Sequence, residues 1–389
     1  MPWENLKVEN LRLKLVHSFL KKEKTMTDLC LENGISRKTG YKWLMRYEKY
    51  GEEGLKDLSK APHDPHIYYP PDIIDRAIDL KQKKLTWGPK KIIAKLEDIY
   101  PDEEWPSPTR LYHIFKEHNL VTKKRIKARV PATAPLGDLN NCNDTWAVGL
   151  KGWFLTGDNN KCEPLTITDC FSRYAIRCVH LNRHTVEYVW PVFADAFREY
   201  GLPKKVRSDN GPPFGSTGVG RLTGLSVNLI KAGVTPEWIN PGHPEENGRH
   251  ERFHSTLQQE VANPAKASLI LQIQANCKFV DEYNFERPHE ALNMKTPASV
   301  YTKSLRSWDG ILRKPEYDTK EMMVRKVCQS GCLWLYQNEH YIGQALIGEY
   351  IGLKTNEQGE FEVYYGPIYL GKLVKEGLEK PKVKKRRQR

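Results

Sequence analysis

The stretch TWAVGLKGWFLTGDNNKCEPLTITDCFSRYAIRCVHL, residues 145–181, decides the fold of the middle of this chain. It holds three runs rich in branched and aromatic residues, 145–156, 162–169 and 173–181, and the turn-forming sequence Gly-Asp-Asn-Asn separates the first two. Such runs, bounded by turn residues, predict strands joined by short connections. The three runs are therefore expected to form an antiparallel meander.

Downstream of these strands the pattern alternates between helices and strands. Helices are expected over 185–200 and 220–231, and short strands over 204–209 and 235–240, from the spacing of their apolar residues. A long helix that carries Glu251 follows. Three meandering strands followed by alternating helices and strands is the element order of a ribonuclease H-like α/β fold.

The first part of the chain is predicted to form a helix-turn-helix DNA-binding unit. Apolar residues recur at helical spacing over 8–19, and a short helix over 26–32 precedes Gly34, where the turn needs a positive φ. Ser36 is placed to cap a basic helix that runs to Tyr50. An ordinary helical hairpin with a solvated basic face would give the same pattern. The residues expected in its core are Ile35, Tyr41, Trp43 and Leu44, and those expected to enter the major groove are Ser36, Arg37, Lys38, Thr39 and Lys42.

A second helical unit follows a segment rich in proline and histidine. Its sequence predicts one helix from Ile73, another with Pro89 in its first turn, and a third that Ser107 could cap. Two helix-turn-helix-like units in tandem favour DNA binding more strongly than one. The residues of the third helix that are expected to be exposed and to face DNA are Thr109, Arg110 and His113.

The composition also favours a polyanionic partner. The 389 residues carry a formal net charge of +13, and lysines and arginines release condensed counterions when they meet phosphates. A merely basic surface is the alternative. The eight cysteines form no C-x-x-C pair, so neither a disulfide framework nor a structural zinc site is indicated. No apolar run approaches a membrane span and no signal peptide is recognisable, which predicts a cytoplasmic, nucleoid-associated protein without a membrane partner.

The remaining segments are linkers and a small β domain. Lys123, Lys124 and Arg125 open an extended linker that is expected to follow DNA phosphates, although a solvated charge run is the alternative. Short alternating runs near the C-terminus predict an all-β barrel of the SH3-like kind, which could bind DNA or another protomer. The expected organisation is a helix-turn-helix domain (1–60), a linker (61–70), a second such domain (71–122), a basic linker (123–140), the ribonuclease H-like domain (141–305), the β-barrel (320–375) and a basic, disordered tail (376–389).

Three motifs in the second half resemble the integrase core of bacterial insertion-sequence transposases, which are relatives of retroviral integrases. They are VRSDNGPPF (206–214), PGHPEENGRHERFHSTL (241–257) and FERPHEALNMKTPASVY (285–301), and ISRKTGYKW (35–43) extends the resemblance to the N-terminal region. The resemblance implies a DDE polynucleotidyl transferase that cleaves DNA and transfers strands. It also implies a homo-oligomer that acts on the terminal inverted repeats of a mobile element and on target DNA.

The same resemblance implies three carboxylates that hold divalent metal ions, Mg²⁺ or Mn²⁺. One ion activates the attacking oxygen and the other stabilises the leaving oxygen, and Mg²⁺ requires hard oxygen ligands. Their places in the motifs make Asp209 the second carboxylate and Glu251 the third. Taken alone, Asp209 could simply initiate a turn, and Glu251 could be a solvated glutamate favoured by the helix dipole.

Gly149 stands where the resemblance implies the first aspartate. Glycine offers no side-chain ligand, so a bridging donor is missing. Asp144, Asp158 and Asp169 lie near in sequence, but none stands at the expected position. Two functions therefore remain open: a transposase-like transferase with weak or absent catalysis, and a catalytically inactive DNA-binding relative or regulator.

A competing motif lies on the same helix as Glu251. His250 and His254 flank it in the H-E-x-x-H pattern of zinc metalloproteases. The pattern is short, its flanks are polar and no third ligand is evident, so this is a remote alternative. Under the integrase resemblance the two histidines lie on the helix surface or support the site. Asn210, His243 and Asn247 are expected near the site, and Arg287 and His289 are expected to pack or to contact phosphate.

Overall fold

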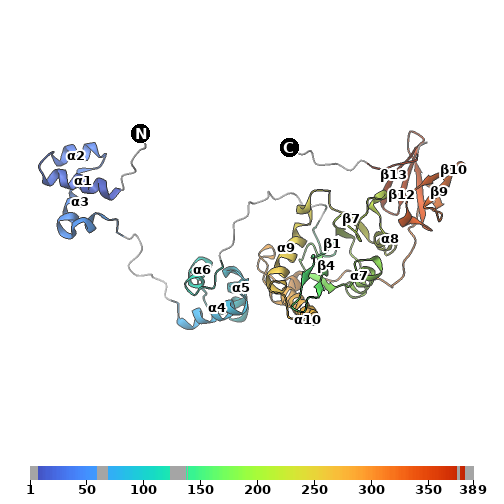
Figure 1. The fold of residues 1–389 in the computed structure, drawn as a ribbon, viewed down its shortest axis with the longest axis horizontal. Helices are drawn as coiled ribbons and strands as arrows, with labels where there is room; N and C mark the ends of the chain where they lie inside the picture. Colours follow the sequence, from blue (N-terminus) through green and yellow to red (C-terminus); the bar gives the residue numbers. More distant parts are fainter. Residues whose placement is uncertain (1–7, 59–68, 123–136, 138, 375–376, 382–389) are drawn as a thin grey trace. The chain divides into compact units, whose positions relative to one another are not determined.

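The computed structural model of this protein describes residues 8–58, 69–122, 137, 139–374 and 377–381, and the chain divides into two compact units, Met1–Tyr68 and Tyr69–Arg389 (Figure 1). Several predictions lie outside the described residues: most of the 61–70 linker, the basic linker residues Lys123, Lys124 and Arg125, and residues 376 and 382–389 of the C-terminal tail. Gly377–Glu379, which the sequence places in the disordered tail, form a strand instead. None of the described helices combines the length and the apolar character that crossing a membrane requires.

The first unit is the predicted set of helices, α1 (Val8–Leu20), α2 (Met26–Glu32) and α3 (Arg37–Tyr50). Gly34 has the expected positive φ of 64°, and Ser36 caps α3 by accepting the Thr39 amide. Gly40 lets α2 and α3 pack closely, because a Cβ there would lie 2.5 Å from the Cys30 sulfur. The expectation that Tyr41 lies in the core is wrong. Its ring packs edge-on against Phe19 and remains 42% exposed, because the buried stripe of α3 runs through Gly40, Trp43 and Leu44.

The second unit begins with three further helices, α4 (Pro71–Lys83), α5 (Pro89–Ile99) and α6 (Pro108–Glu117). Each has a proline in its first turn, and Ser107 caps α6 as predicted. The buried ammonium of Lys81 donates to the carbonyls of Leu85 and Trp87, 2.5 and 2.8 Å away, which fixes the turn between α4 and α5. Their shared core consists of Ala77, Ile78, Trp87, Ile92, Leu96, Leu111, Ile114 and Phe115.

A five-stranded sheet forms the centre of the second unit, in the order β5-β4-β1-β6-β7. The first three strands in chain order pair antiparallel as predicted, and β6 and β7 add to the other side of β1 in parallel. The expected first strand is interrupted after Leu150, because Gly152 has a φ of 83°. The rest of that predicted strand forms β2, which pairs with β3 in a separate two-stranded sheet. The strands are β1 (Thr145–Leu150), β2 (Phe154–Leu155), β3 (Lys161–Cys162), β4 (Pro164–Asp169), β5 (Ala175–His180), β6 (Lys205–Ser208) and β7 (Thr235–Trp238).

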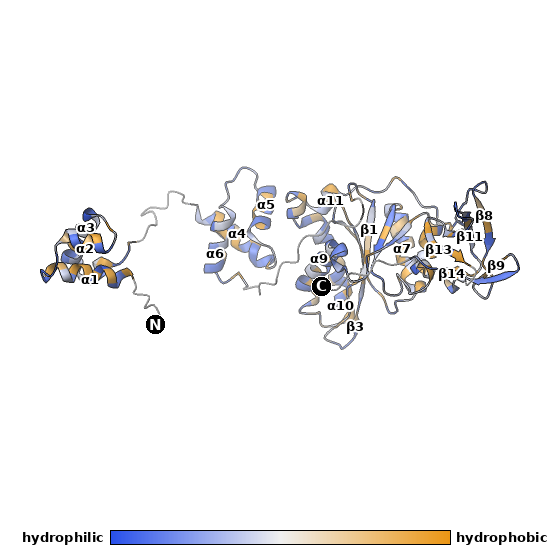
Figure 2. Ribbon diagram, turned by 90° about the horizontal axis from the view of Figure 1, so that it is seen from above, coloured by the Kyte–Doolittle hydropathy of each residue, from blue (hydrophilic) through white to orange (hydrophobic). Residues whose placement is uncertain are grey.

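Helices cover both faces of this sheet, giving the ribonuclease H-like architecture. Trp146 and Val148 of β1 pack on α7 and α8, and hydrophobic residues gather there (Figure 2). The opposite face is covered by α9 and α10, where Phe253 and Phe279 share a cluster with Ala175. The helix expected from residue 220 begins four residues later, since Thr223 forms its capping box. These helices are α7 (Val186–Tyr200), α8 (Gly224–Lys231), α9 (Gly248–Leu257), α10 (Leu269–Asp281) and α11 (Pro297–Val300), and π-helical turns Gln258–Ala262 and Glu282–Glu286 extend α9 and α10.

An all-β domain follows the sheet-and-helix domain. Five of its strands form one antiparallel sheet in the order β14-β13-β12-β11-β8, and β9 and β10 form a separate hairpin. Its core continues into the preceding domain through Val219, Leu222 and Ile230. Its strands are β8 (Met322–Lys326), β9 (Cys332–Leu335), β10 (Asn338–Tyr341), β11 (Tyr350–Thr355), β12 (Phe361–Tyr365), β13 (Ile368–Val374) and β14 (Gly377–Glu379). Short 3-10 helices cover Gly51–Leu55, Val219–Arg221, Pro244–Asn247, Glu290–Leu292 and Gln344–Leu346.

Candidate active site

The carboxylates of Asp209 and Glu251 come from two elements that both adjoin β1. Asp209 directly follows β6, which pairs with β1 in parallel, and Glu251 lies in the first turn of α9, which packs on β1. Lost hydration raises the pKa of both carboxyl groups, and the negative charge of Asp209 raises that of Glu251 further. The two side chains are therefore close enough to repel each other, although both remain exposed to solvent.

Lys151 is a functional candidate that the sequence argument missed. It directly follows β1, and its positive charge lowers the pKa of Glu251 while burial lowers the pKa of Lys151 itself. The signal was its place two residues after Gly149, at the end of the strand that should carry the first carboxylate. A cation here partly neutralises the pair of carboxylates.

Gly149 faces the helix that carries Glu251. A Cβ built on it would lie 3.3 Å from the Cδ2 and Nε2 atoms of His250 and 3.5 Å from Cε1 of His254. The space where a side chain of β1 would enter the site is thus bordered by two imidazole rings. Any residue other than glycine would have to displace these rings by a few tenths of an ångström.

The two imidazoles belong to a buried network with two strand threonines. The Thr166 hydroxyl lies 2.9 Å from His250 Nε2, 2.7 Å from His254 Nε2 and 3.1 Å from the Gly149 carbonyl oxygen. The Thr168 hydroxyl lies 2.8 Å from His250 Nδ1. Burial lowers the pKa of both histidines, that of His254 to about 4, so both rings are neutral near pH 7.

Of the two positions expected for His250 and His254, the helix surface is wrong, and their burial fits a position that supports the site. His250 and His254 are buried and not on the helix surface, because their rings pack against β1 and β4. Both ring nitrogens of His250 are engaged by threonine hydroxyls, which leaves none directed at a metal. Within the described ranges, no cluster of three or more His, Cys, Asp or Glu side chains could hold a metal ion. The geometry therefore gives the zinc protease alternative no support.

The three aspartates nearest to Gly149 in sequence all have structural roles. Asp144 accepts the Asn140 and Asn141 amides and pairs with a lysine, and Asp158 accepts the Thr156 hydroxyl in a turn. Asp169 is buried and accepts the amide and hydroxyl of Ser172 together with the amide of Asn143. Their oxygens are therefore engaged within these turns and in an ion pair.

The residues predicted to lie near the site are largely held by the protein itself. Asn210 donates to the Ile239 carbonyl and accepts from Arg221, so its amide fixes the loop after β6. His243 Nδ1 lies 2.9 Å from a carboxylate oxygen of Glu245, and Asn247 is buried at the start of α9. Such loops are anchored rather than presented for contact with a nucleotide.

The predicted DNA-facing residues separate into exposed cations and capping groups. Arg37, Lys38 and Lys42 are exposed on α3, and the ammonium of Lys42 lies 4.9 Å from the centroid of the Trp43 ring. The Ser36 hydroxyl contacts the amide and hydroxyl of Thr39, so both of these side chains serve the helix cap. On α6, Thr109, Arg110 and His113 are exposed as predicted.

Comparison with known proteins gives domain matches along much of the chain. The Integrase core domain family matches residues 232–297, the Homeodomain-like domain matches 39–115 and the Helix-turn-helix domain matches 11–63. The integrase match includes α9 and Glu251, whereas Asp209 and Gly149 lie before it. The chain therefore carries helix-turn-helix domains followed by an integrase core domain.

Similar proteins come from insertion elements. An uncharacterized 31.7 kDa protein of insertion element IS407 from Burkholderia multivorans is 26% identical over 232 residues, which cover 59% of this chain and 80% of that protein. An uncharacterized 39.2 kDa protein of insertion element IS476 from Xanthomonas euvesicatoria is 26% identical over 226 residues, which cover 57% of this chain and 62% of that protein.

Solved structures with a similar fold include retroviral integrases. The HTLV-2 integrase catalytic core domain in complex with magnesium is 15% identical and has a TM-score of 0.34, with 42% of this chain and 99% of that chain covered. A chain of the simian T-cell lymphotropic virus intasome in complex with PP2A regulatory subunit B56 gamma is 15% identical and has a TM-score of 0.37, with 71% of this chain and 97% of that chain covered.

Proposed function

Because this chain carries an integrase core domain and helix-turn-helix domains and is similar to insertion-element proteins, we propose that it is a transposase-like DNA-binding protein with the architecture of a DDE polynucleotidyl transferase. Its ligands are the terminal inverted repeats of a mobile element and the target DNA, bound by a homo-oligomer in the cytoplasm near the nucleoid. Its cleavage and strand-transfer activity is weak or absent. The observation that supports weak or absent catalysis is Gly149. Two imidazoles border the space beside it, where the side chain of a first carboxylate would enter the site.

The carboxylates of Asp209 and Glu251 would hold one divalent cation, Mg²⁺ or Mn²⁺. The charge of Asp209 makes ionisation of Glu251 more costly, and a hard cation between the two exposed carboxylates would relieve that repulsion. A bound ion would supply Lewis-acid stabilisation of a phosphodiester oxygen. With two donors in place of three, the pair fits one ion better than the two that strand transfer uses.

The all-β domain is proposed to be the SH3-like module of the transposase architecture. Its five-stranded sheet with a separate hairpin is compatible with a small barrel, and its core is continuous with the integrase core domain through Val219 and Ile230. This shared hydrophobic core favours an all-β domain that moves together with the integrase core domain rather than independently of it.

A second function is a DNA-binding relative without catalysis, such as a regulator that competes for the same DNA ends. The Gly149 network favours it, since His250 and Thr166 make a complete set of hydrogen bonds that needs no metal. A strand-transfer assay with Mg²⁺ or Mn²⁺ separates the two functions. Product above background that Asp209→Asn abolishes supports a weak transferase, and DNA binding without product supports the regulator.

Binding of Mn²⁺ is expected to depend on Glu251. The Glu251→Gln variant should bind Mn²⁺ more than about tenfold more weakly than the natural protein, since losing even a residue that supports a ligand costs that much. Paramagnetic resonance of free Mn²⁺ in a titration measures the change. Glu187→Gln is the matched control, because Glu187 is also an exposed glutamate in the first turn of a helix. Equal Mn²⁺ affinity in both variants would remove Glu251 from the metal site.

DNA binding by the first helical unit is expected to depend on the beginning of α3. Arg37→Ala should weaken DNA binding by roughly 1–3 kcal/mol, because the first residues of a recognition helix meet the major groove. Lys49→Ala removes one charge from the other end of the same helix and should cost less. Fluorescence anisotropy with a labelled duplex measures both. Equal losses would show that α3 offers only unspecific positive charge.

A further inference from the structure

A group of cations meets where the second helical unit contacts the integrase core domain. Lys91 comes from the first turn of α5, Arg173 from the turn after β4, Arg252 from α9 and Arg287 from the segment after α10. We call these four residues the junction recess. Lys91 is affected by the positive charges of Arg287 and Arg252, and His289 by those of Lys91, Arg287 and Arg173, which places all of them in one neighbourhood.

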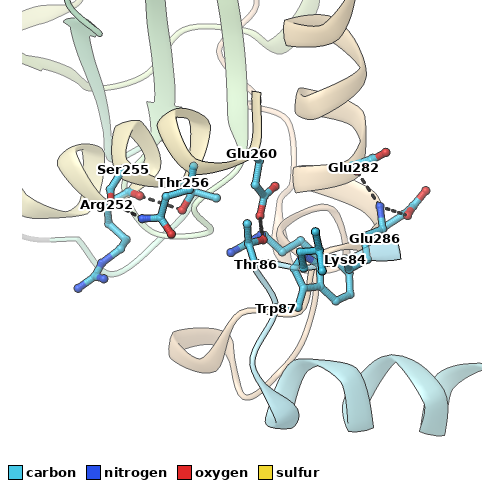
Figure 3. A network of polar contacts seen from close by, with 12 residues as sticks. Lys84, Thr86, Trp87, Arg252, Ser255, Thr256, Glu260, Glu282 and Glu286 are labelled. Atoms are coloured by element: carbon cyan, nitrogen blue, oxygen red, sulfur yellow. Dashed lines mark hydrogen bonds and ion pairs between the residues drawn. The ribbon is translucent and has the colours of Figure 1, made fainter. Parts of the chain in front are cut away.

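The position of α5 against the core is fixed by several polar contacts (Figure 3). Lys84 lies 2.7 Å from a Glu282 oxygen and 3.4 Å from a Glu286 oxygen, and the Thr86 hydroxyl donates to Glu260. Lys84 and Thr86 lie in the turn between α4 and α5, a few residues before Lys91. These contacts hold the turn before α5 against the integrase core domain, so the positions of the junction recess residues are fixed relative to one another.

The acids near the junction recess are already engaged by other partners. Glu260 accepts from Arg287 and Thr86, and Glu290 pairs with Lys90 at 2.7 Å. Among the described residues, neither Lys91, Arg173 nor Arg252 has an ion pair through its charged group. Three positive charges are therefore left without a matching acid.

The environment of Lys91 makes its positive charge costly. The pKa of Lys91 is lowered to about 8, first by burial and then by the charge of Arg287, with a smaller contribution from Arg252 and with Glu260 and Glu290 acting in the opposite direction. Burial and the charge of Arg249 likewise lower the pKa of Arg173. Cations held together in this way are stabilised by nearby negative charge, and a DNA strand supplies one negative charge at each of its successive phosphodiesters.

We propose that the junction recess binds backbone phosphates of the DNA strand that passes Glu251, so that the second helical unit contributes Lys91 to the DNA-binding surface of the integrase core domain. This inference rests on the proposed function. Arg252 directly follows Glu251 on α9, so the helix that carries the candidate metal ligand also carries one cation of the recess. At its other side, a cleft of 430 Å³ is lined by Lys90, Lys91, Thr109 and Tyr112 and leads to α6. A DNA strand is favoured as the ligand over a single small anion. The reason is that the cations continue from α9 to α6, the helix predicted to face DNA.

The test compares Lys91→Met with Lys83→Met in the full-length protein. Methionine keeps the apolar stem of lysine and removes the charge, and Lys83 is an exposed lysine of the same helical unit. Binding of a labelled duplex carrying the element end is measured from 50 to 300 mM salt. Lys91→Met should lose affinity several-fold, with a slope of log K against log salt that is smaller by about 0.9. The melting temperature of Lys91→Met should be unchanged or higher, since a half-buried charge without an ion pair is removed.

Three other results would overturn the inference. If the natural protein binds DNA and Lys91→Met shows the affinity and slope of Lys83→Met, the recess does not hold DNA phosphates, while the proposed function stands. If the natural protein binds no DNA, the proposed function falls and the inference with it. If inorganic phosphate stabilises the natural protein but not Lys91→Met, and DNA affinity is equal in both, the recess is a site for a small anion.

Discussion

Replacing Gly149 with aspartate is expected to raise Mg²⁺-dependent strand transfer by roughly 10²- to 10⁴-fold over the natural protein, because a third metal ligand is worth several kcal/mol of transition-state stabilisation. The position lies on the central strand, and its missing side chain faces the helix that carries Glu251. A carboxylate there would join those of Asp209 and Glu251 from a third element. The measurement is the yield of joined product from a labelled element end.

The aspartate should be accommodated with little rearrangement. The nearest atoms to its Cβ are side-chain atoms of His250 at 3.3 Å and His254 at 3.5 Å, so the imidazoles need to move only by a few tenths of an ångström. Gly149→Asn is the matched control, since it has almost the same shape but supplies a neutral, weaker ligand. If Gly149→Asp folds and binds DNA but joins no more product than Gly149→Asn, the rest of the site is not competent. The protein would then be the DNA-binding regulator.

Much of the fold follows from local sequence signals. Ser36 and Ser107 cap the helices that they precede, and the meander of strands is recognisable because turn residues separate branched and aromatic runs. Local signals also misplaced some boundaries. Gly152 interrupts the first predicted strand because its φ is positive. Glycine adopts this conformation easily, but the hydrophobic residues around it give no sign that the strand ends there.

The candidate site was less predictable than the fold, because long-range packing determines it. The sequence left open whether His250 and His254 lie on the helix surface or support the site, and hydrogen bonds to Thr166 of β4, more than 80 positions away in sequence, hold both rings in buried positions. The importance of Lys151 likewise depends on the approach of α9 to the end of β1. Motif spacing identified Asp209 and Glu251, whereas only the packing shows what fills the place of the absent carboxylate.

Replacing Thr166 with valine is expected to destabilise the integrase core domain by roughly 2–4 kcal/mol. Valine has nearly the same shape as threonine, so no cavity forms, but the hydroxyl that contacts His250, His254 and the Gly149 carbonyl is lost. Two buried imidazole nitrogens would then lack partners, and each unsatisfied buried polar group costs about 1–3 kcal/mol. Hydrogen exchange of peptides from β1 and β4 measures this change without mixing in the unfolding of the other domains.

Thr145→Val provides the control for this prediction. Thr145 is also buried and lies on β1, but its hydroxyl makes no hydrogen bond within the part of the chain that the structure describes. Its replacement should change protection of the same peptides by less than about 0.5 kcal/mol, because only a methyl-for-hydroxyl exchange occurs. If Thr166→Val leaves protection as high as Thr145→Val does, the histidines are not held by Thr166. In that case the side of α9 facing Gly149 is free to rearrange, and the imidazoles would not define the space that an aspartate must enter.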